Sequence, residues 1–199
     1  MSLAAAPLPK TRPKSLLAVL VRRRIALSMM IFGGLIASAF LRGVRPHDLL
    51  NYRDPLSMIG LLLVVLGVAM RSWAAGTLTK STQLTTTGPY RLVRNPLYLG
   101  SLLMLIGFCL VIGDVWILAV GLVPLTVLYF LKVRAEERFL KGKFGADWLA
   151  FAARTPRLLP RKLPRGDGSW RFAQWLDNRE YQASLTAAVA LVALQVWSR

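Results

Sequence analysis

The sequence is poor in the residues that most often carry metal, redox or acid–base chemistry. A single cysteine, Cys109, lies in an apolar run, which excludes an internal disulfide and a cysteine-based metal site. A single histidine, His47, excludes a histidine cluster, so we expect no metal centre. Nine acidic residues stand against 26 Lys and Arg in a chain of 199 residues, and the formal net charge is +17. Few side chains therefore remain as candidates for chemistry.

The surplus of positive charge does not have the pattern of a nucleic-acid surface. The basic residues flank apolar blocks, and they do not form a stripe with interleaved aromatic residues. We therefore expect no nucleic-acid partner. The oligomeric state stays open.

What the chain has in abundance is long uncharged runs. It is 55% hydrophobic, where soluble domains average roughly 45–50%. The runs predict an all-α, multi-pass integral membrane protein with about five transmembrane helices. Only Gly113-Asp114 separates the third run from the fourth, which predicts a tight helical hairpin over 97–131. Gly33-Gly34 in the first run suggests close helix packing. The runs are 25–41, 56–75, 97–112, 115–131 and 183–197.

Charge and hydropathy divide the chain into three parts and orient it. We expect a basic N-terminal segment (1–24), a transmembrane core (25–160), and a basic and aromatic linker with a last apolar helix (161–199). Whether 183–197 spans the membrane or lies on it stays open. The positive-inside rule places the N-terminus, 76–96 and 132–182 in the cytoplasm, which fits a bacterial inner membrane. Arg42, Arg45, Arg53 and Arg199 are left outside.

A polar, turn-rich stretch over 88–100 leads into the third apolar run. Gly88-Pro89 marks a turn, and Asn95-Pro96 predicts a helix start with Asn95 as the N-cap. A free helix N-terminus together with Arg91 and Arg94 offers donors to an anion such as a carboxylate. The alternative is a loop whose Tyr and Arg side chains only anchor it at the membrane interface.

Two adjacent acids, Glu136 and Glu137, follow the fourth run. We expect the helix to continue past them to about Lys143 and to stop at Phe144-Gly145. One interpretation is a solvated, salt-bridged helical extension. The other is a site in which a glutamate holds an ammonium group while the arginines or the helix amides hold a carboxylate. A ligand that carries both groups is an amino acid or S-adenosylmethionine.

At these residues the chain resembles the isoprenylcysteine carboxyl methyltransferase family, which includes phospholipid N-methyltransferase relatives. The resemblance covers about 56–160. Asn95 stands where the family has histidine, and Trp148 and Phe151 stand where it has two tyrosines. The motifs are Gly88-Pro89-Tyr90, Arg94-Asn95-Pro96-Leu97-Tyr98-Leu99-Gly100, Glu136-Glu137-Arg138-Phe139-Leu140, Phe144-Gly145, and Thr155-Pro156-Arg157-Leu158-Leu159-Pro160.

The resemblance implies a membrane methyltransferase with a cytoplasmic pocket for S-adenosylmethionine. The positive charge of the loop suggests Arg94 as one cofactor-binding residue, and the resemblance implies the others. The full expected set is Thr82, Gln83, Leu84, Thr85, Tyr90, Arg94, Asn95, Pro96, Leu97, Tyr98 and Glu136.

Three further residues are candidates for the transfer step. The resemblance implies that Lys132 faces the acceptor, and Arg154 could help to position an acceptor carboxylate or phosphate. A carboxylate acceptor is already ionised at neutral pH and needs no base, whereas an amine acceptor must lose a proton, for which Glu137 and its neighbour are the candidates. We expect a lipid-like or prenylated acceptor, most simply a carboxylate, with a phospholipid amine as the alternative. A non-enzymatic membrane scaffold or lipid-binding protein is the alternative from another class.

Overall fold

The computed structural model describes residues 24–79, 83–161 and 170–199, and within these ranges every regular element is a helix. Most of the basic segment 1–24 therefore lies outside the described residues, as does Thr82. The division into three parts stays a prediction.

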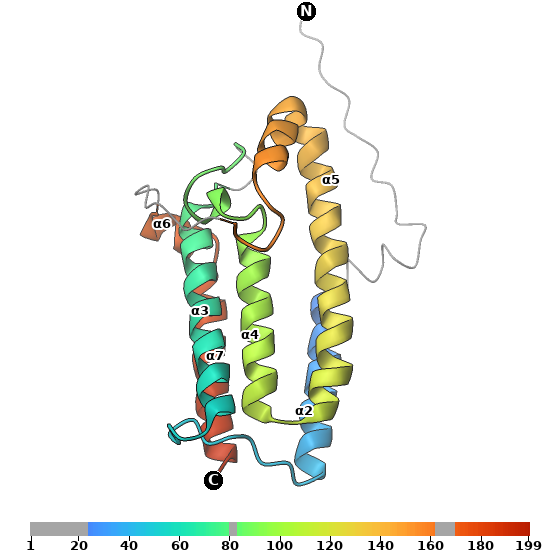
Figure 1. Ribbon diagram of the computed structural model, residues 1–199, viewed down its shortest axis with the longest axis vertical. Coiled ribbons are helices and arrows are strands. Elements are labelled where there is room, and N and C mark those ends of the chain that lie inside the picture. Colours follow the sequence, from blue (N-terminus) through green and yellow to red (C-terminus); the bar gives the residue numbers. More distant parts are fainter. Residues whose placement is uncertain (1–23, 80–82, 162–169) are drawn as a thin grey trace, which may run out of the picture.

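The helices run up and down along one long axis (Figure 1). In chain order they are α2 (Arg24–Leu41), α3 (Pro55–Thr77), α4 (Pro96–Ile112), α5 (Val123–Arg154), α6 (Phe172–Asp177) and α7 (Glu180–Trp197), with a 3-10 turn η1 (Gly88–Arg91) and a π-helical segment η2 (Ile117–Leu122) that runs into α5.

Two of these helices are long and apolar enough to cross a bilayer. They are Pro55–Thr77 and the continuous helix Ile117–Arg154, while Pro96–Ile112 is a shorter apolar helix. Because every regular element in the described residues is a helix, the expected all-helical fold is confirmed. The count of five membrane spans stays a prediction. The predicted hairpin is present, with Gly113 in the left-handed conformation (φ 68°) that ends α4.

The helices α3 and α4 pack against each other through glycines. A Cβ added to Gly67 would lie 2.6 Å from the Gly100 carbonyl oxygen, and one added to Gly107 would lie 2.6 Å from that of Gly60. Such close approach of backbones is possible only without side chains, as is common between membrane helices. The expectation for Gly33-Gly34 is wrong, because a Cβ on either residue would meet no atom within 4 Å.

The helix that carries Glu136 continues further than expected. The predicted stop at Phe144-Gly145 corresponds to a sharp break, with Gly145 at φ 50° and ψ −117°, and the helix then resumes as far as Arg154. A positive φ is readily available to glycine. After the break the chain turns back over the bundle end, where Trp148 and Phe151 are buried.

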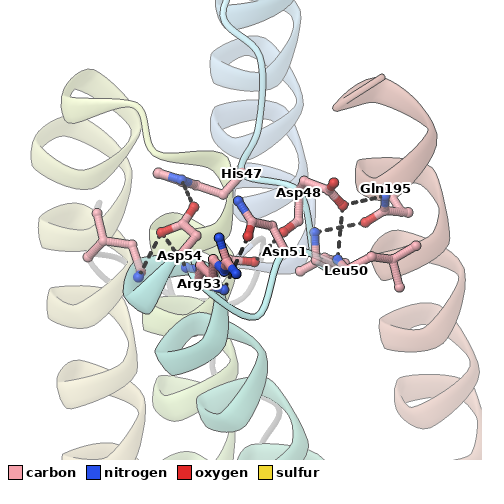
Figure 2. A network of polar contacts seen from close by, with 10 residues as sticks. His47, Asp48, Leu50, Asn51, Arg53, Asp54 and Gln195 are labelled. Atoms are coloured by element: carbon pink, nitrogen blue, oxygen red, sulfur yellow. Dashed lines mark hydrogen bonds and ion pairs between the residues drawn. The ribbon is translucent and has the colours of Figure 1, made fainter.

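At the opposite end of the bundle, a polar network joins the α2–α3 loop to α7 (Figure 2). Asp54 caps α3 and contacts the His47 ring, while Asp48 accepts a hydrogen bond of 2.8 Å from the Gln195 side chain. The Leu50 amide and Gln195 hold the pKa of Asp48 below its usual value, because they donate to its charged form. Helices far apart in the sequence are thereby fixed to one another.

The alternating helix directions place residues 76–79, 83–96 and 132–161 at one end of the bundle, and we predict that this end is cytoplasmic. A cysteine at Thr86 or Arg161 should then resist an impermeant thiol reagent in intact cells. A cysteine at Tyr52, which is exposed at the other end, is the matched control and should react. The native Cys109 is buried and gives the background. Labelling at 86 and 161 without labelling at 52 would invert the orientation.

Candidate functional site

A cavity of about 630 Å³ lies at this end of the bundle. Its walls come from the end of α3, the segment after it, η1, the start of α4, and α5 with its returning turn. Of the expected cofactor-binding residues, those that line it are Gln83, Leu84, Thr85, Tyr90, Arg94, Asn95, Pro96, Leu97, Tyr98 and Glu136.

The three candidates for the transfer step do not line this cavity. Lys132 is half-buried one turn before Glu136, and Arg154 is exposed at the end of α5. Glu137 is buried, but it lies in an ion-pair network beside the cavity. The sequence placed all three at the correct end of the bundle, but it could not determine which way each side chain points.

Glu137 fastens the segment after α5 to the loop before α4. Its Oε2 lies 2.7 Å from Arg157 Nη2, and its Oε1 accepts a hydrogen bond of 3.1 Å from Asn95 Nδ2 and lies 3.6 Å from Arg94 Nη1. Glu137 raises the pKa of Arg157, because its carboxylate accepts hydrogen bonds from the charged guanidinium. The surroundings of Glu137 are those of a structural ion pair.

This network also corrects the expected role of Asn95 as a helix cap. Asn95 stands at the N-cap position of α4, but its side chain makes no capping hydrogen bond and points to Glu137 instead. The backbone amides at the start of α4 therefore donate no hydrogen bond to the Asn95 side chain.

Glu136 behaves differently from its neighbour, since it lines the cavity. Its Oε2 accepts a hydrogen bond of 2.8 Å from the Tyr98 hydroxyl. Tyr90 is buried nearby, and its pKa is raised well above the ordinary value because burial disfavours the phenolate and Glu136 and Glu180 add negative charge. The Tyr90 hydroxyl is therefore protonated at neutral pH and can donate a hydrogen bond.

Arg94 brings a buried donor to the same cavity. Its guanidinium lies over the Trp148 ring, 6.0 Å from the ring centre. Its Nε is buried and has no hydrogen-bond partner in the described part of the chain. Because an unpaired buried donor is costly, this atom points to a ligand with an acceptor oxygen.

Sequence reasoning did not single out Arg71. Its Nε lies 2.7 Å from Glu180 Oε1 of α7, and its side chain lines the cavity. The available signal was an arginine inside an apolar run, which by itself suggests a functional site. Its partner could not be found, because Glu180 is more than a hundred residues away.

We predict that Glu137 acts mainly in stability. Glu137→Gln should lower the free energy of unfolding by about 2 kcal/mol, between the ~1 kcal/mol of an exposed ion pair and the ~3–5 kcal/mol of a buried one. Denaturant unfolding of the detergent-solubilised protein measures this. Asp147→Asn removes an exposed acid from the same helix and should change stability by less than about 0.5 kcal/mol. A Glu137→Gln protein as stable as the wild type would return Glu137 to the list of candidates for the chemistry.

Two proteins of known name are similar to this chain. Cobalt-zinc-cadmium resistance protein CzcN of Cupriavidus metallidurans is 35% identical over 115 residues, which are 56% of this chain and 53% of that protein. Nickel-cobalt-cadmium resistance protein NccN of Alcaligenes xylosoxydans xylosoxydans is 28% identical over 151 residues, 75% of this chain and 70% of that protein. The chain thus spans about half the length of the first relative. No solved structure matches.

Residues 56–147 match the phospholipid methyltransferase family. This range holds α3, α4 and most of α5, and it therefore includes most of the walls of the cavity. The match confirms the resemblance that the motifs indicate, to a family of membrane methyltransferases.

Proposed function

We propose that this protein is a membrane methyltransferase that uses S-adenosylmethionine and transfers the methyl group to a lipid-like acceptor. The observation that carries the proposal is the convergence of Glu136, the unpaired Nε of Arg94 and a set of aromatic rings on one cavity. The family match over residues 56–147 supports the reaction type.

The residues of the cavity fit the cofactor. A volume of about 630 Å³ is within the range of ~300–1,000 Å³ that is usual for small-molecule sites. S-adenosylmethionine supplies an activated methyl group on a sulfonium, together with an ammonium and a carboxylate. Glu136 is the acid suited to the ammonium, and Arg94 is the cation suited to the carboxylate. Rings of Tyr98, Tyr129 and other residues present π-faces that attract a cation.

The chain itself has to align and desolvate the reacting groups more than it has to move protons. Methyl transfer is a displacement whose rate depends on orientation and on exclusion of water. Trp148 and Phe151, carried back over the cavity by the turn at Gly145, supply an apolar cover. Tyr98 holds Glu136 by its hydroxyl and so fixes the carboxylate on the cavity wall.

A carboxylate is the acceptor that these side chains favour. It needs no base, and of the three candidates for the transfer step none reaches the cavity. An amine, as in phospholipid N-methylation, is the second candidate, with Glu136 as the acid–base group that lines the cavity. A scaffold without activity stays the alternative from another class, and it predicts no cofactor affinity.

The proposed setting is the bacterial inner membrane, with the cavity open to the cytoplasm. The two relatives are named for resistance to metal ions. No group of three or more His, Cys, Asp or Glu that could hold a metal occurs among the described residues. We therefore propose that a role of this chain in metal resistance acts through methylation of a membrane component.

The cofactor half of the proposal is tested at Glu136. Glu136→Gln should weaken S-adenosylmethionine binding by about 2–5 kcal/mol, because the ammonium loses a desolvated charge partner. Calorimetry on the purified protein measures the loss, with Asp147→Asn as the control of equal charge change. Unchanged affinity in Glu136→Gln removes Glu136 from the site.

The acceptor half is tested with acceptors that share one carboxylate head and differ in tail length. Transfer of labelled methyl should rise with tail length, because each buried methylene contributes about 0.8 kcal/mol. Phospholipid amines in the same assay test the second candidate. Activity that is independent of tail length, or is best on a small soluble acceptor, contradicts a lipid-like substrate.

A further inference from the structure

Arg71 lies where two cavities meet. Besides the candidate site, a second cavity of about 840 Å³ lies between α2, α4, α5 and α7, and the two share Arg71, Ser101 and Tyr129 in their walls. All three nitrogens of the Arg71 guanidinium donate a hydrogen bond: Nε and Nη2 to the Glu180 carboxylate at 2.7 and 2.9 Å, and Nη1 to the Ser101 hydroxyl.

The second cavity is apolar along most of its length. Its walls include Ile36 of α2, Met104 and Phe108 of α4, Leu125 of α5 and Leu194 of α7. Its polar lining residues include Arg71, Ser101 and Tyr129, which also line the candidate site, together with Gln182 and Thr186. A long apolar space with an arginine at one end would suit an amphiphile with an anionic head, once that head replaces the present counterion of the arginine.

Glu180 occupies the position that such a head group would take. A guanidinium binds a carboxylate through two parallel hydrogen bonds, and Glu180 supplies this arrangement from the first turn of α7. An anion at a helix N-terminus is stabilised by the helix dipole, so the Glu180 carboxylate retains a favourable interaction when it leaves Arg71. A half-buried arginine that loses its counterion is destabilised, and a ligand carboxylate would replace the lost counterion.

We propose that Arg71 binds the anionic head of the lipid-like acceptor, that the tail of the acceptor occupies the apolar cavity, and that Glu180 is the counterion which the head group replaces. This inference rests on the proposed function, and it specifies the substrate class as a long-chain carboxylate. Glu180 lies outside the range 56–147 that matches the family. The last helix therefore contributes to substrate selection and is more than a membrane anchor.

The alternative is that the ion pair only holds α7 against α3. The two explanations predict opposite changes in ligand binding when Glu180 is replaced. If Glu180 competes with a ligand anion, Glu180→Gln strengthens binding of that anion. If Glu180 only holds the fold together, the same change weakens binding of every amphiphile. A probe pair with one tail and two heads separates charge from packing: labelled palmitate, and hexadecanol as its neutral counterpart, in mildly alkaline buffer.

Equilibrium binding to the full-length protein in detergent gives the result. Glu180→Gln should bind palmitate about tenfold more tightly, Arg71→Gln should bind it about tenfold more weakly, and hexadecanol should change less than about twofold in either. Arg42→Gln is the matched control, since it breaks the Arg42–Asp114 ion pair of 2.7 Å at the opposite end of the bundle. It should leave the preference for palmitate unchanged.

Weaker binding of both probes to Glu180→Gln, or an unchanged palmitate preference in Arg71→Gln, overturns the inference. Should either single variant fail to fold, the double variant Arg71→Gln/Glu180→Gln leaves no unpaired charge, and a palmitate preference retained there also overturns it. Binding of S-adenosylmethionine to the same wild-type preparation separates the two proposals. Cofactor binding without Arg71-dependent selectivity rejects this inference alone, whereas selectivity without cofactor binding rejects the proposed function alone.

Discussion

The close packing of α3 on α4 is the constraint on which the candidate site depends. Gly60 and Gly67 face Gly107 and Gly100 so closely that an added Cβ would meet backbone oxygen on the opposite helix. Because the two helices cannot separate without losing this contact, the end of α3 and the start of α4 are held side by side. The segment between them has to close over that end, and it brings Tyr90 and Arg94 to the wall of the cavity.

Three buried or half-buried glutamates near this end have three different surroundings. Glu136 faces the cavity and is held by a phenol. Glu137, the next residue, points in a different direction and is neutralised by Arg157. Glu180 comes from α7 and neutralises Arg71. Glu136 is thus the glutamate that faces the cavity, and Glu137 fixes the segment after α5. Glu180 holds Arg71 in the structure, and in our proposal the head group of the acceptor replaces it.

The sequence predicted the parts of this arrangement that depend on local pattern. Uncharged runs bounded by Pro, Gly and charges gave the helices, because a helix in lipid needs a continuous apolar surface. The short Gly113-Asp114 turn forced the motifs on either side of the hairpin to the same end. Side-chain direction and long-range pairing were not predictable. The Asn95 side chain leaves its helix for Glu137, and Arg71 pairs with a residue of the last helix, since both choices depend on neighbours that only the folded chain supplies.

The most direct measurement is an experimental structure of the full chain with S-adenosylhomocysteine bound in detergent or a lipid disc. The account predicts density for this ligand in the cavity of about 630 Å³, with its amino group at Glu136 and its carboxylate at Arg94. Density in the apolar cavity instead, or an empty site at saturating ligand, would contradict the account.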